Sequence, residues 1–215
     1  MILEINQIKT NFNMEWIVLK RDEMFCKAVS PFEKGLFRTN IHYSDGRIQS
    51  TCYNPSDTSY GSKIADRLSF KVFDNETHVG HIVGRTQKTG KFLCAYPYYE
   101  FIYHGEEYRG YEIGFGGKGL FICLYKNDKL LAIVDKRLRV INFKDIYTAY
   151  IENSQFASVL IPFILYYDVT AHGDVMEIAL LSVQEKRVNT IQKELIVKYD
   201  PDFIPRIKAM DGITE

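Results

Sequence analysis

The chain has few of the features that mark secreted, metal-binding or nucleic-acid-binding proteins. Its 215 residues contain four cysteines, Cys26, Cys52, Cys94 and Cys123, and none of them forms a CxxC pair. Acidic and basic residues are equally numerous, 27 of each, so the chain lacks the broad basic field of a dedicated nucleic-acid binder. The N-terminal Met1 to Glu4 has neither the basic nor the long apolar region of a signal peptide. We therefore expect a cytoplasmic protein whose thiols are reduced and buried.

Long apolar runs are also scarce, because the chain contains only one, Phe156 to Tyr167 (FASVLIPFILYY). A helix that spans a bilayer needs about 20 apolar residues, so this run predicts a helix buried inside protein and no transmembrane segment. Asp168 and then His172-Gly173 close the run. We expect this helix near residues 155–171.

Short alternating segments joined by turn residues fill most of the chain before that run. Leu36 to Tyr43 and Arg47 to Tyr53, for example, flank Ser44-Asp45-Gly46, and Asp-Gly between alternating segments indicates a β-hairpin. About a dozen such strands precede the apolar run. The aromatic share of 14% also suits pleated, half-buried surfaces. The pattern predicts a mainly β protein in which an antiparallel sheet wraps around a central hydrophobic helix.

Two segments, Leu120 to Tyr125 and Leu130 to Val134, are apolar on both faces. Antiparallel strands of this kind need a packing partner on each side. One face can meet the apolar helix, and Asp174 to Glu215, with mixed helical patterning, can cover the other. We therefore expect a barrel with its helix at 1–173 and a partly helical C-terminal extension packed on it at 174–215. Asn54 to Lys63 is the most loop-like stretch.

The chain contains four further motifs: Tyr96 to Phe101, Tyr111 to Gly114 with Gly116 to Gly119, Leu131 to Ile133 with Lys136, and Asn142 to Tyr147. Together they resemble the bacterial branch of the tubby C-terminal-like superfamily, to which phospholipid scramblases and plant LURP-one-related proteins also belong. The resemblance covers Leu68 to His172 and implies a closed barrel of 12 strands threaded by a hydrophobic helix. The chain lacks the cysteine-rich palmitoylation cluster of the scramblases, which argues against lipid scrambling itself. We expect a non-enzymatic protein.

Patterns that suggest catalysis or metal binding do not fit their structural requirements. Gly114 to Gly119 matches GxGxxG, but a predicted strand follows it, whereas a dinucleotide site needs a helix there. His78 and His81 are three residues apart on a predicted strand and so point to opposite faces. His172-Gly173-Asp174 has no accompanying nucleophile. We predict no catalytic residue, no metal site and no cofactor.

One basic segment, Lys136 to Val140 (KRLRV), suggests a ligand site. If it is a strand, Arg137 and Arg139 share its outer face, and two guanidiniums about 7 Å apart can hold a phosphate. The spacing is similar to that of a Lys-x-Arg strand pair with which tubby binds phosphoinositides. The alternative is that both arginines belong to a solvated outer face. Further lysines could enlarge the patch from nearby turns: Lys126, Lys129 and Lys144.

Two hypotheses of function follow from these residues. In the first, the chain is a non-enzymatic cytosolic module, peripheral at the membrane, that binds anionic lipid headgroups or another phosphate-bearing ligand through Lys136, Arg137 and Arg139. In the alternative, it is a protein-interaction or scaffold domain without a small-molecule ligand, and it displays loops such as Asn54 to Lys63 to a protein partner. Neither hypothesis involves nucleic acid.

Overall fold

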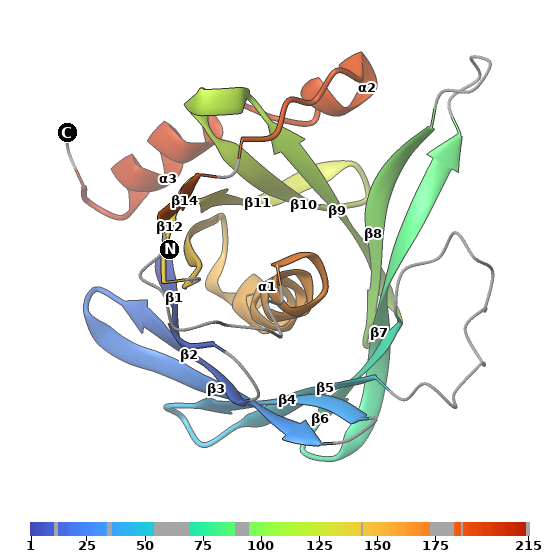
Figure 1. The fold of residues 1–215 in the computed structure, drawn as a ribbon, viewed down its shortest axis with the longest axis vertical. Coiled ribbons are helices and arrows are strands. Elements are labelled where there is room, and N and C mark those ends of the chain that lie inside the picture. Colours follow the sequence, from blue (N-terminus) through green and yellow to red (C-terminus); the bar gives the residue numbers. More distant parts are fainter. Residues whose placement is uncertain are drawn as a thin grey trace.

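The chain forms a closed barrel of twelve antiparallel strands, as predicted (Figure 1). The computed structural model describes residues 1–10, 13–33, 36–53, 69–88, 95–142, 144–172, 183–185 and 187–213. The predicted loop Asn54 to Lys63 and Cys94 lie outside these residues. The barrel strands are β1 (Ile2–Lys9), β2 (Asn13–Lys20), β3 (Glu23–Glu33), β4 (Leu36–Tyr43), β5 (Ile48–Tyr53), β6 (Phe70–Asp74), β7 (Thr77–Lys88), β8 (Ala95–Tyr103), β9 (Glu106–Gly114), β10 (Leu120–Lys126), β11 (Lys129–Lys136) and β13 (Ile146–Ile151).

The strands follow one another around the barrel in chain order, and β1 closes it by pairing with both β2 and β13. Two-residue turns such as Arg21-Asp22, Asn75-Glu76 and Asn127-Asp128 join several of the hairpins, and both residues of each have positive φ. Such turns match the right-handed twist of the strands that they connect. They all lie at one end of the barrel, which we call the turn end. We call the opposite end, where β11 finishes before Arg137 and Arg139, the arginine end.

The helix α1 (Ala157–His172) lies within the ring of strands in Figure 1. Every residue from Val159 to Asp168 is buried. The Phe163 ring packs against Tyr99 of β8 at 5.6 Å between centroids, and Tyr166 packs against Phe70 of β6 at 5.1 Å. No helix of the described residues is long and apolar enough to span a membrane.

Pro162 lies inside α1 and has no N–H to donate to the carbonyl of Ser158, four residues earlier. A buried carbonyl without a partner is costly. The side chain of Gln49, on β5, donates from Nε2 to this carbonyl at 3.2 Å. The barrel wall therefore supplies the hydrogen bond that the helix cannot make.

The C-terminal segment packs on the outer face of β9 to β11. It contains α2 (Lys193–Ile196) and α3 (Phe203–Met210), and residues 188–190 run beside Gly114. A Cβ on Gly114 would lie 2.2 Å from the Val188 carbonyl oxygen, so only glycine allows this approach. Strands β10 and β11 are consequently buried on both faces. The outer apolar cluster joins Leu195, Phe203 and Ile207 to Tyr96, Tyr111, Ile113, Phe121, Cys123 and Ile133.

The enclosure of α1 predicts a large difference between two equivalent substitutions. Ile164 is fully buried in α1, and Ile191, in the C-terminal segment, is 82% exposed. Ile164→Asp places an unpaired carboxylate in the core, so we expect it to lower the free energy of unfolding by about 4 kcal/mol or more and to reduce soluble expression. Ile191→Asp, the matched control, should change it by less than about 0.5 kcal/mol. Urea unfolding measures both values, and equal stability of the two variants would contradict the enclosed position of α1.

Candidate functional site

Arg137 and Arg139 do not lie on one continuous strand, so that part of the prediction is wrong. β11 ends at Lys136, the chain leaves the barrel, and Arg139 begins the short strand β12 (Arg139–Ile141). This strand pairs outside the barrel with β14 (Val183–Glu185). Both arginines are nevertheless exposed. Within the described part of the chain, neither guanidinium forms a salt bridge, and the nearby Asp135 is half-buried.

Lys136 takes no part in this exposed pair. It is 1% exposed, forms an ion pair with Asp145, and its Nζ lies 5.2 Å from the centre of the Tyr147 ring. Gln7 fixes Asp145 from β1, because the backbone N–H of each residue donates to an oxygen of the other at 3.0 Å. The lysine thus anchors the chain where it leaves the barrel, and we withdraw it from the predicted ligand-binding residues.

Lys126 and Lys129 do not enlarge the patch either. They face each other at the β10–β11 turn, whereas Lys136 faces Leu120 at the far end of the same hairpin. At about 3.3 Å per residue, the two lysines lie about 20 Å from the arginines, at the turn end. Lys126 also pairs with Glu106 at 3.2 Å, and Lys129 pairs with Glu152 at 2.7 Å. Of the predicted turn lysines, only Lys144, exposed just before β13, belongs to the arginine end.

The exposed charges of this neutral chain are distributed unevenly between the two ends of the barrel, because successive connections lie at alternate ends. The arginine end carries many exposed cations, whereas the described carboxylates of its barrel strands are buried or half-buried, and the exposed Glu194 of α2 lies near Tyr96. Exposed carboxylates gather instead at the turn end, with basic residues among them. Charge is thus polarised along the barrel axis. The exposed cations at the arginine end are Lys9, Arg38, Lys88, Lys118, Arg137, Arg139, Lys144 and Arg187, and the exposed acids at the turn end include Asp22, Glu23, Asp45, Glu76, Glu106, Glu107 and Asp128.

A buried polar cluster lies beneath the arginine end. Asp168 of α1 accepts a hydrogen bond from Trp16 Nε1 at 2.8 Å and another from the Tyr147 hydroxyl. Burial raises the pKa of Asp168 to about 7, and the nearby Asp145 carboxylate acts in the same direction. The two hydrogen bonds and Lys136 favour the charged form but do not overcome these effects. This cluster ties the C-terminal part of α1 to β2 and β13.

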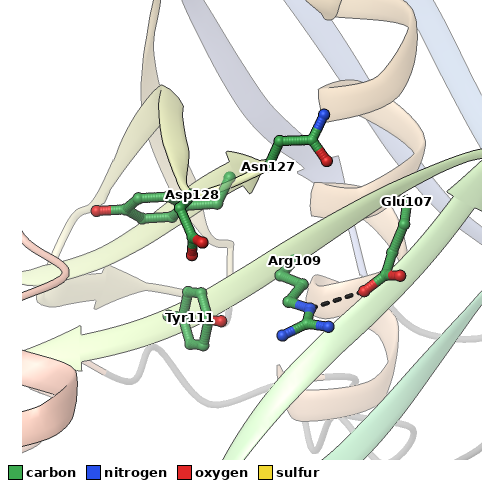
Figure 2. A pocket seen from close by; sticks show the side chains of 6 residues that line it. Glu107, Arg109, Tyr111, Asn127 and Asp128 are labelled. Carbon is green, nitrogen blue, oxygen red and sulfur yellow. Dashed lines mark hydrogen bonds and ion pairs between the residues drawn. The ribbon is translucent and has the colours of Figure 1, made fainter.

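A hollow of about 210 Å³ lies on the outer face near the turn end, and the sequence analysis missed it (Figure 2). Three of its lining side chains come from alternate positions of β9 and project outward into the hollow: Glu107, Arg109 and Tyr111. This alternation is the one sign of the hollow that the sequence contains. The Arg109 guanidinium donates from Nε to Glu107 at 2.7 Å. The remaining walls come from the β10–β11 hairpin: Tyr125, Asn127 and Asp128.

The described residues contain no group of three or more His, Cys, Asp or Glu side chains that could hold a metal ion. The GxGxxG stretch joins β9 to β10 through the short 3-10 helix η1 (Gly116–Lys118), and a strand follows it, as expected. Cys26 and Cys123 are buried free thiols.

No family model, no curated protein and no solved structure matches this chain. The resemblance to the tubby-like superfamily therefore stays a prediction.

The raised pKa of Asp168 predicts a pH-dependent stability. An aspartate in the unfolded chain loses its proton near pH 4, whereas folded Asp168 keeps it up to about pH 7. Between these values the folded state binds more protons, so the free energy of unfolding should fall as pH rises from about 4 to about 7. Asp168→Asn should lessen this fall by a few kcal/mol.

Urea titrations at pH 4.5, 5.5, 6.5 and 7.5 measure this slope in the wild type and in the variant. Asp128→Asn, at a carboxylate whose side chain is 96% exposed, is the control and should retain the wild-type slope. If Asp168→Asn retained it too, another group would be responsible for the pH dependence.

Proposed function

We propose that the chain is a non-enzymatic, tubby-like barrel module that binds phosphate-bearing headgroups of anionic membrane lipids at its arginine end. The observation that carries this proposal is the polarised charge of the barrel. A neutral protein has no overall attraction to an anionic surface, but a charge dipole along the barrel axis turns its basic end toward that surface.

Arg137 and Arg139 are the residues that we assign to the headgroup. Both are exposed; the half-buried Asp135 is the carboxylate near Arg137, and Glu185 lies opposite Arg139 in the β12–β14 pair. A guanidinium can donate two parallel hydrogen bonds to phosphate oxygens, which adds direction to the charge attraction. Two interactions fix the backbone at Arg137. They are the buried Lys136–Asp145 ion pair and the hydrogen bond from Arg137 N to Ile146 O, which is 2.9 Å long.

The other cations of the arginine end would act at longer range. Lys88, at the end of β7, and Lys118 and Lys144, on two connections, are exposed around the barrel mouth. Each basic residue close to an anionic membrane contributes about 1 kcal/mol, and the attraction falls off within about 8 Å at physiological ionic strength. We therefore expect peripheral membrane binding to which each basic residue contributes little. The contributions of the residues at the arginine end add up, and salt weakens their sum.

Co-sedimentation with vesicles tests the proposal. We expect the wild type to bind vesicles of phosphatidylcholine mixed with phosphatidylserine or a phosphoinositide, to bind less as salt rises, and to ignore pure phosphatidylcholine. Arg137→Glu with Arg139→Glu should weaken binding by at least about 30-fold, since two residues of about 1 kcal/mol each are lost. Both side chains are exposed, so the thermal unfolding temperature should stay within a few degrees.

Lys126→Glu with Lys129→Glu is the matched control, because it reverses the same number of charges at the turn end. This variant should bind vesicles as the wild type does. Equal losses in the two double variants would mean that binding follows overall charge and not the arginine end. Absence of wild-type binding at low salt to every anionic lipid would reject the lipid function and leave the scaffold alternative. Inhibition by inorganic phosphate would point to free phosphate as the ligand.

A further inference from the structure

Lys198 of the C-terminal segment inserts its ammonium group between two tyrosines of the barrel wall. Its Nζ lies 5.3 Å from the centre of the Tyr111 ring and 5.1 Å from that of Tyr125. The carboxylate of Asp128 lies 3.7 Å from the same nitrogen, and the Tyr125 hydroxyl donates to the Lys198 carbonyl at 2.7 Å. We call Tyr111, Tyr125 and Asp128 the tyrosine cage.

The cage has the geometry and electrostatics that favour an organic cation. The two rings stand at 79° to each other with centroids 5.7 Å apart, so two aromatic surfaces converge on one place. Burial raises the pKa of Tyr125 to about 12 and also raises that of Tyr111, so both phenols are neutral at pH 7. The rings therefore attract a cation through their faces, and the negative charge comes from Asp128.

Lys198 does not fill the space around the cage. The hollow of Figure 2 is lined by all three cage residues and continues past them to Glu107 and Arg109. Its volume of about 210 Å³ is smaller than the roughly 300–1,000 Å³ of pockets that enclose whole drug-sized ligands, so the hollow suits one small chemical group.

The charges around the hollow indicate which kind of chemical group it would bind. Arg109 is neutralised by Glu107 at 2.7 Å, and Asp128 is neutralised by Lys198. When Lys198 withdraws, one carboxylate is left without a partner beside two ring faces. That arrangement matches one monovalent cation and repels an anion.

We propose that the tyrosine cage and its hollow bind an alkylated ammonium group, and that Lys198 occupies the cage as an internal competitor. A trimethylammonium group fits this chemistry best, because its spread charge and methyl groups lose little on leaving water and pack against the rings. The group could belong to a free small molecule such as choline or to a trimethylated lysine of another protein. The site is independent of the headgroup site at the arginine end.

Removal of the competitor gives the test. In Lys198→Ala the cage is empty, so choline and tetramethylammonium should shift the ring NMR signals of Tyr111 and Tyr125 at about tenfold lower concentration than in the wild type. Lys193→Ala, which removes an exposed lysine from the same segment, is the matched control and should titrate as the wild type does. Lys198→Gln should behave as Lys198→Ala does, which separates loss of the charge from loss of the side chain.

Further arms test the chemistry of recognition. 3,3-Dimethylbutan-1-ol, the neutral isostere of choline, should produce no comparable shifts, and Asp128→Asn or Tyr111→Leu in the Lys198→Ala background should abolish the response to choline. A peptide with trimethyllysine that binds where choline does not would identify a protein source, and binding of choline itself a small molecule.

Two results would overturn the proposal. One is equal binding of choline and its neutral isostere, which would make the hollow merely apolar. The other is a Lys198→Ala variant that is folded, as judged by its thermal unfolding, and that binds neither choline, tetramethylammonium nor the peptide. In that case the cage only fastens the C-terminal segment to the barrel.

Discussion

A helix that is apolar on nearly all sides must be enclosed, and the barrel of this protein is matched to α1 in chemistry. Near its start and near its end, α1 has a polar group that forms a hydrogen bond with the barrel wall. Gln49 satisfies the carbonyl that Pro162 leaves free, and Trp16 and Tyr147 donate to Asp168. These bonds fix the helix along the barrel axis, and the packed rings fix its rotation.

The sequence predicted the barrel well because its signals are local. Alternating strands and two-residue turns such as Asn127-Asp128 are visible in a few consecutive residues, and a meander of hairpins brings successive strands together without long crossings. The prediction failed at Lys136 to Val140 for the opposite reason. Lys136 is buried because Asp145, nine residues later, pairs with it, and β12 leaves the barrel because it pairs with the distant β14. The alternating pattern of a single strand shows neither the ion pair nor the pairing with β14.

The candidate sites depend still more on distant residues. Lys198 reaches Tyr111 and Tyr125 only because the C-terminal segment folds back over β9 and β10. The polarised charge, by contrast, was within reach of the sequence. Successive turns of an antiparallel meander lie at alternate ends, so charges summed over every second connection would have separated acids such as Glu107 from cations such as Arg137. The net charge of zero concealed this difference, because it sums over both ends.

The two proposed sites should respond differently to salt, because they lie about 20 Å apart and use different forces. This separation exceeds the Debye length of about 8 Å at physiological ionic strength, so a ligand at one site hardly alters the potential at the other. Attraction at the arginine end acts between exposed charges and weakens strongly as salt rises. At the tyrosine cage the two ring faces add a cation–π attraction, whereas the attraction of the exposed Asp128 carboxylate is screened as it is at the arginine end. We therefore expect cation binding at the cage to lose less affinity than headgroup binding at the arginine end as salt rises.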